Sequence, residues 1–220
     1  MKETMSVNLS KGQKVNLSKE HPGLSEVVVG LGWEAADKNG SDSKPKKGLF
    51  SMLSSALFGE VRSIPSDQTI DCDSSVFLLK NDKLQSEDDI ICYYNLKHST
   101  KAVIHRGDNL VGSSGKNDDE QIVVDLNQLP QDYNRLVIIV NIYRAREKKQ
   151  HFGKVRNAYV RLVNNKNGQE LYRYNLTENY DGYTAMIFSE LYRHNREWKF
   201  SAIGQGTNDG SIAELARRYS

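Results

Sequence analysis

The chain has 220 residues, of which 38% are hydrophobic and 26% are charged, and its formal net charge is +2. This composition suits a globular domain with a hydrophobic core, and no apolar run approaches the ~18 residues that a membrane-spanning helix needs. Two cysteines are too few for a disulfide framework or a four-sulfur zinc site, and residues 1–20 lack the apolar stretch of a secretory signal, so a cytoplasmic location is expected.

The charges are unevenly distributed along the chain. Between Asp67 and Asp125 there are 12 acidic and 6 basic side chains, a net charge of −6, while the remainder carries +8. Such a concentration of like charge is unfavourable unless the carboxylates bind cations or pair with bases elsewhere in the fold. On charge alone, a solvated acidic face paired with the basic remainder is the simpler interpretation.

Short apolar runs rich in β-branched and aromatic residues follow one another along the chain. The pentapeptide VNLSK occurs at residues 7–11 and again at 15–19 with Gly12 between the copies, which predicts an opening hairpin. Each later run is short for a helix and is bounded by turn residues. The predicted strands are 27–29, 76–79, 90–94, 102–105, 121–125, 136–143, 158–163, 170–174, 184–194 and 197–203.

Turn residues indicate how the later strands connect. Asn167-Gly168 favours a hairpin between 158–163 and 170–174, and residues 194–196 join the last two strands. So many short strands with tight turns indicate an all-β fold, a sandwich or a barrel. Residues 211–219 predict a short C-terminal helix that ends on two arginines.

Residues 37–70 interrupt this pattern. A loop rich in Gly, Ser, Lys and Pro occupies residues 37–47, and the apolar positions of residues 48–60 have nearly helical spacing. Such a helix either covers a sheet or binds a membrane surface beside the preceding lysines. We favour the covering helix, because thirteen residues make only a marginal membrane anchor.

Two acidic stretches are candidates for binding a cation. Asp71 and Asp73 lie on the same side of an extended chain, because side chains alternate along a strand. The loop between the strands at 102–105 and 121–125 carries further carboxylate and amide side chains at Asp108, Asn109, Asp118, Asp119 and Glu120. Calcium takes six to eight oxygen ligands in flexible geometry, so these stretches suit it, although EF-hand spacing is absent and a solvated metal-free turn is the alternative.

Signatures of catalysis are poor. The chain has no G-x-S-x-G, H-E-x-x-H or C-x-x-C sequence, and its histidines show no metal-ligand spacing. An enzyme acting through His105 or His151 is therefore a minor alternative to a non-enzymatic protein. Basic residues are not interleaved with aromatic ones in one patch, so no nucleic-acid partner is predicted.

Several segments resemble the TerD family of bacterial tellurium-resistance and general-stress proteins. The matching segments are VNLSKGQKVNLSK at 7–19, VVVGLGWE at 27–34, DCDSSVFLL at 71–79, YYNLK at 93–97, HRGDN at 105–109, DDEQIVVDL at 118–126, FGKVRNAYVRLVN at 152–164, ELYRYNL at 170–176 and AMIFSELYRHNREWKFSAIGQG at 185–206. They cover nearly the whole chain outside residues 37–70, and the last segment is the most specific.

The resemblance implies a β-sandwich of two sheets that binds calcium, usually two ions close together, at loops on one edge; for this chain one or two calcium ions are expected. The family's ligand positions correspond to Asp71, Asp73, Asn95, Asp108, Asn109, Asp118, Asp119 and Glu120. Of these, Asn95 is implied by the resemblance alone. The chain departs from the family at residues 113–117, where Lys116 stands in a run that is usually rich in acids and glycines. Its positive charge is expected to weaken or remove a second ion site.

These observations together predict one domain over residues 1–220 with an insert at about 37–70, folded as a sandwich of two mainly antiparallel sheets with short helices in the insert and at the C-terminus. The expected function is a cytoplasmic, non-enzymatic, calcium-binding stress-response protein whose ordered acidic loops form an interaction surface for protein partners. The alternatives are a metal-independent scaffold protein and a peripheral membrane protein, bound at the inner membrane face through residues 48–60.

Overall fold

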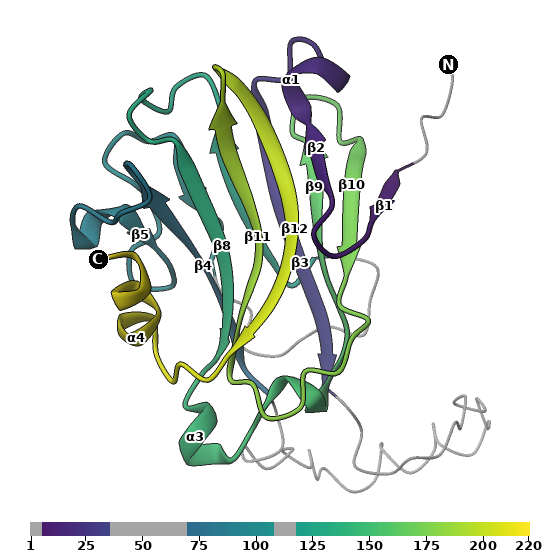
Figure 1. Ribbon diagram of the computed structural model, residues 1–220, viewed down its shortest axis with the longest axis vertical. Helices are drawn as coiled ribbons and strands as arrows, with labels where there is room; N and C mark the ends of the chain where they lie inside the picture. The colour runs from purple at the N-terminus through teal and green to yellow at the C-terminus, as the bar shows by residue number, and fades with distance from the viewer. Residues whose placement is uncertain (1–5, 36–69, 108–117) are drawn as a thin grey trace, which may run out of the picture.

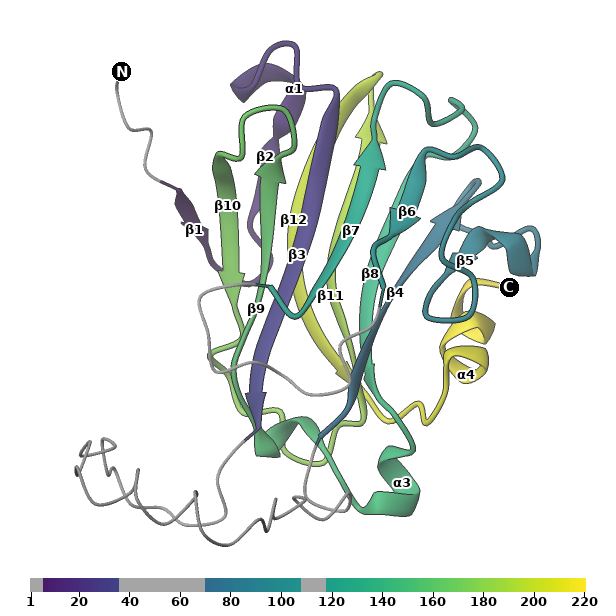
Figure 2. The same ribbon diagram turned by 180° about the vertical axis from the view of Figure 1, so that it is seen from behind.

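The computed structural model describes residues 6–35, 70–107 and 118–220, which form two facing six-stranded sheets (Figures 1 and 2). Sheet A contains β1 (Val7–Leu9), β3 (Glu26–Ala35), β6 (Val103–His105), β7 (Glu120–Asp125), β9 (Val155–Asn164) and β10 (Glu170–Asn175), in the order β1-β10-β9-β3-β7-β6. Sheet B contains β2 (Lys14–Asn16), β4 (Cys72–Leu79), β5 (Ile90–Ile91), β8 (Arg135–Ile142), β11 (Ala185–His194) and β12 (Glu197–Thr207), in the order β2-β12-β11-β8-β4-β5. The predicted all-β sandwich is confirmed.

The helices are short. They are α1 (Leu17–Glu20), α3 (Ala145–Lys148) and α4 (Ile212–Ala216), with the 3-10 turns η1 (Glu87–Asp89), η2 (Phe152–Lys154) and η3 (Arg217–Tyr219). None of these described helices is long and apolar enough to cross a membrane. The loop predicted at residues 37–47 and the helix predicted at 48–60 lie outside the described residues.

Side-chain alternation builds the core between the sheets. In β7, Glu120, Ile122 and Val124 are buried while the residues between them are partly exposed. In β3, Leu31 and Trp33 face the core, so Gly30 and Gly32 belong to the outer face of sheet A. This alternation decides which polar side chains of each strand lie between the sheets and which lie outside them.

A second hydrophobic cluster covers the outer face of sheet B. Leu215 of α4 packs with Phe77 of β4 and Val137 of β8, and the Tyr219 ring meets the Phe77 ring edge-on at 5.9 Å between centroids. The Ser211 side chain caps α4 by accepting a hydrogen bond from the Glu214 backbone N–H. The predicted C-terminal helix is therefore confirmed, and it buries the far side of β4.

The predicted hairpins have different outcomes. The one between β9 and β10 is present, and β11 and β12 are joined by Asn195 and Arg196, which both have positive φ as in a type I′ turn. The opening hairpin is wrong. β1 pairs parallel with β10 in sheet A, whereas β2 pairs antiparallel with β12 in sheet B, so the two VNLSK copies lie in different sheets.

Candidate functional site

The two acidic stretches meet near the start of β4. Burial raises the pKa of the Cys72 thiol well above its ordinary value, and the charges of Asp73, Glu120, Asp71 and Asp119 raise it further. All four carboxylates are therefore close enough to one buried thiol to act on it electrostatically. β4 belongs to sheet B and β7 to sheet A, so the carboxylates come from both layers of the sandwich.

Glu120 binds an open side of β4. Residues 72–75 pair with β8 on one side, whereas β5 pairs only with Val76 and Phe77 on the other. On that open side the Ser74 backbone N–H donates to Glu120 Oε2 at 2.8 Å. Because the N–H and C=O groups of one residue in an antiparallel strand point the same way, the Ser74 carbonyl oxygen faces the same side as the Glu120 carboxylate.

Asp71 supplies a buried oxygen atom without a hydrogen bond. Its Oδ1 is shielded from solvent and has no partner in the described part of the chain, and the same holds for Oδ1 of Asn141, which pairs with Asp73 across the strands. Burial raises the pKa of Asp71, Lys148 opposes this shift, and the charge of Glu120 adds to it. Such groups gain from a bound cation, which would satisfy the oxygen and offset the repulsion.

The described residues do not by themselves form a closed metal site. No three His, Cys, Asp or Glu side chains within residues 6–35, 70–107 and 118–220 converge closely enough to hold an ion. Asp108 and Asn109 lie outside the described residues. Asn95 lies in the turn after β5, where its Nδ2 donates to the Ile90 carbonyl at 2.9 Å.

Asp118 has a different environment from Asp119 and Glu120. Its carboxylate accepts two hydrogen bonds from Arg161, at 2.7 and 2.9 Å, and further ones from the Tyr159 hydroxyl and the Gln121 amide. It is fully buried over Gly30, where a Cβ atom would overlap it. This ion pair lies on the outer face of sheet A, and its donors satisfy Asp118 without a metal.

His105 forms a buried contact that the sequence did not reveal. Its Nε2 lies 2.9 Å from Ser74 Oγ and 3.5 Å from Glu120 Oε2, and its Nδ1 accepts a hydrogen bond from the Gly107 backbone N–H. In the neutral ring the proton is then on Nε2, which donates to Ser74. A histidine in this tautomer does not accept the serine proton, so the pair lacks the arrangement of a nucleophile and its base.

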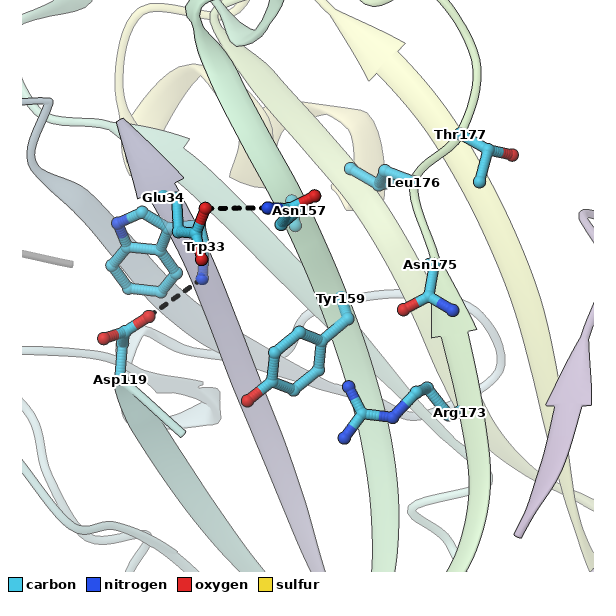
Figure 3. A pocket seen from close by; sticks show the side chains of 10 residues that line it. Trp33, Glu34, Asp119, Asn157, Tyr159, Arg173, Asn175, Leu176 and Thr177 are labelled. Atoms are coloured by element: carbon cyan, nitrogen blue, oxygen red, sulfur yellow. Dashed lines mark hydrogen bonds between the residues drawn. The ribbon is translucent and has the colours of Figure 1, made fainter. Parts of the chain in front are cut away.

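A pocket of about 290 Å³ opens beside Asp119, one of the acidic residues near the start of β4 (Figure 3). It is lined by Trp33, Glu34, Asp119, Asn157, Ala158, Tyr159, Arg173, Asn175, Leu176 and Thr177. Asp119 connects the two regions, because its Oδ2 accepts a hydrogen bond from the Trp33 backbone N–H at 2.8 Å. No motif in the sequence indicated this pocket, since its residues come from segments far apart in the chain.

Glu170 links the two arginines next to the pocket. Burial would raise the pKa of Glu170, but hydrogen bonds from Arg173, Arg161 and the Ser6 hydroxyl outweigh it and hold the pKa at about 2, below the ordinary 4.5. A carboxyl group with a lowered folded-state pKa stabilises the protein above its unfolded value and loses that contribution as the pH falls through the folded value.

In Glu170→Gln the free energy of unfolding is therefore expected to fall less between pH 4.5 and pH 2 than in wild type. Urea unfolding at a series of pH values measures it. Glu178→Gln is the matched control, because Glu178 is about half exposed and pairs only with Lys11 and the Tyr180 hydroxyl among the described residues. Parallel pH profiles for wild type and Glu170→Gln would contradict the assigned pairing.

Similarity to known proteins extends over nearly the whole chain. The model of the TerD domain matches residues 5–219. The chain is 42% identical to stress response protein SCP2 of Bacillus subtilis (strain 168), covering 98% of this chain and all of that protein. It is 40% identical to tellurium resistance protein TerD of Serratia marcescens, covering 98% and 97%. Among solved structures, a homologue of telluride resistance protein from Streptomyces coelicolor A3(2) has the same fold, with a TM-score of 0.58 at 16% identity over 90% of this chain and 99% of that one.

Proposed function

The chain belongs to the TerD domain family, and we propose that it is a calcium-binding, non-enzymatic protein of the tellurium-resistance and general-stress type. The observation that carries the proposal is that Glu120 of sheet A binds the open side of β4 in sheet B, near Asp71, whose buried Oδ1 has no hydrogen-bond partner among the described residues. Its physiological role would be to present an interaction surface to protein partners in the stress response.

The donor chemistry fits calcium. The groups around the start of β4 are oxygen donors: the carboxylates of Asp71, Asp119 and Glu120 and the carbonyl of Ser74. On the outer face of sheet B, Asp73 and Asn141 add a further carboxylate and amide. Calcium prefers such hard oxygen ligands at flexible geometry, and its charge would offset the repulsion among the carboxylates.

The predicted acidic residues would have different roles. Asp71, Asp73, Asp119 and Glu120 would hold calcium, whereas Asp118 is engaged by Arg161 and would support the site through the fold. Neutralising these carboxylates would allow β4 and β7, the strands beside which they lie, to approach each other, and it would order the surface around them. A non-enzymatic role is supported by the tautomer of His105, which does not activate Ser74.

Thermal unfolding with calcium and with EDTA tests the proposal. A ligand that binds only the folded state at 100 times its dissociation constant stabilises it by about 2.7 kcal/mol, so calcium is expected to raise the melting temperature by several degrees. Equal melting temperatures in calcium and EDTA would favour the metal-independent scaffold instead.

Asp73→Asn identifies the site. It should weaken calcium binding at least the ~10-fold typical of residues that support metal sites, measured by calorimetric titration. In EDTA the variant should be at least as stable as wild type, because it removes one of several like charges around Cys72. Asp132→Asn is the matched control, since Asp132 pairs with Lys80 beyond the other end of β4. Equal effects of the two substitutions would place the calcium site elsewhere.

A further inference from the structure

The pocket on the outer face of sheet A owes its shape to a β-bulge. Gly32 pairs with Tyr159 and Glu34 with Arg156, so β9 has one residue more than β3 between these pairs. Asn157 lies in the extra step and has φ +51°, a left-handed conformation that Asn tolerates better than most residues. Bulges redirect side chains, and this one turns Asn157 toward Glu34, whose Oε2 accepts a hydrogen bond from Asn157 Nδ2 at 2.7 Å.

The polar walls of the pocket are held in place by neighbours outside it. The Arg173 guanidinium stacks on the Tyr159 ring at 4.0 Å from its centroid, and its Nε and Nη2 donate to Glu170 at 2.9 and 3.0 Å. The Tyr159 hydroxyl is in turn bound to Asp118. Side chains fixed in this way lose little conformational freedom when they bind a ligand, which is typical of a preorganised site.

Arg173 keeps hydrogen-bonding capacity for a ligand. Its Nη1 donates no hydrogen bond to any described residue, while its other two nitrogens hold Glu170. Asn175, which pairs with Tyr159 across the strands, adds an amide at the same end of the pocket. Guanidinium and amide donors of this kind suit a carboxylate group.

Opposite charges stand at the two ends of the pocket. Figure 3 shows Glu34 and Arg173 on opposite sides of Tyr159, as the strand order β3-β9-β10 requires. The backbones of β3 and β10 are two strand spacings apart, about 10 Å. The Glu34 carboxylate and the Arg173 guanidinium reach toward each other from these strands and are closer than the backbones. A lone anion would also meet Glu34 and Asp119, and a lone cation would also meet Arg173.

We propose that this pocket binds a small zwitterion of amino-acid to dipeptide size, with its carboxylate at Arg173 and Asn175 and its ammonium group at Glu34. Asn157 donates to Glu34 through its Nδ2, so its side-chain oxygen can act as an acceptor beside the ammonium group. The volume of about 290 Å³ lies at the lower end of ligand pockets and accommodates a molecule of this size.

Titration of ¹⁵N-labelled protein with glycylglycine tests the proposal by NMR, with EDTA present so that calcium is absent. Saturable shifts are expected at the side-chain signals of Asn157, Asn175 and Arg173. Acetate and ethylammonium, which carry one charge each, are expected to bind at least about tenfold more weakly, because each lacks one charged hydrogen-bonding group.

Two variants and a control complete the test. Glu34→Gln keeps the acceptor for Asn157 but removes the charge, and Arg173→Gln removes the other charge. Each should raise the dissociation constant for glycylglycine at least about tenfold. Lys166→Gln, in the exposed turn between β9 and β10 and outside the lining, should leave it unchanged. Absence of saturable shifts, or equal affinities for wild type and Glu34→Gln, overturns the proposal whatever the calcium titration shows.

Discussion

Asp118→Ala is expected to lower the free energy of unfolding by on the order of 3 kcal/mol, because it leaves the partly buried Arg161 guanidinium without its main partner. The Tyr159 hydroxyl and the Gln121 amide lose an acceptor as well. Urea unfolding measures the loss. A double-mutant cycle with Arg161→Ala should give a coupling energy that shows the two residues act as a pair.

The same variant separates a structural role from a ligand role for Asp118. If the ion pair is its function, calcium affinity should remain close to that of wild type, in contrast to Asp73→Asn. Asp132→Ala is the control for losing an exposed pair, and its effect on stability should be much smaller than that of Asp118→Ala. Unchanged stability together with lost calcium binding would show that Asp118 leaves Arg161 and binds the metal.

Leu215→Ala is expected to destabilise the protein by about 3 kcal/mol, within the range for truncating a buried leucine. Leu215 is fully buried and lies in the cluster with Phe77, Val137 and Ile139 on the outer face of sheet B. The effect is large because the cavity would open beneath a five-residue helix in which Ile212 is the one other buried residue.

Arg217→Ala is the matched control, since Arg217 is exposed in the turn that follows α4 and should change stability by less than about 0.5 kcal/mol. Thermal and urea unfolding measure both variants. Equal stabilities for Leu215→Ala and wild type would show that α4 does not pack on sheet B in solution.

Local patterns predicted most of the strands. The β-branched runs predicted the bounds of β8 and β11 to within one residue. The turn at residues 194–196 was predicted because it lies where the last two apolar runs meet. The opening hairpin failed for a physical reason. β1 and β2 are only three residues long, so their own residues carry little preference, and the free edges of β10 and β12 decide where each pairs.

In the candidate site too, local sequence predicted part of the arrangement and tertiary contacts decided the rest. Alternation and composition placed acidic residues at the ends of two strands, and the structure brings Asp71, Asp73, Asp119 and Glu120 near one thiol. The sequence treated Asp118 as equivalent to its two neighbours. It is set apart by Arg161, 43 residues away, and by the absence of a side chain at Gly30.

By itself, the sequence determined the β-rich fold, the turns between neighbouring strands and the family, because period-two alternation, turn residues and matching segments are properties of short stretches of chain. Only the tertiary structure decided which strands share a sheet, where the carboxylate of Asp118 points, and that Glu34 and Arg173 enclose one pocket. These features depend on contacts between residues far apart in the chain, and such contacts exist only once the two sheets have packed together.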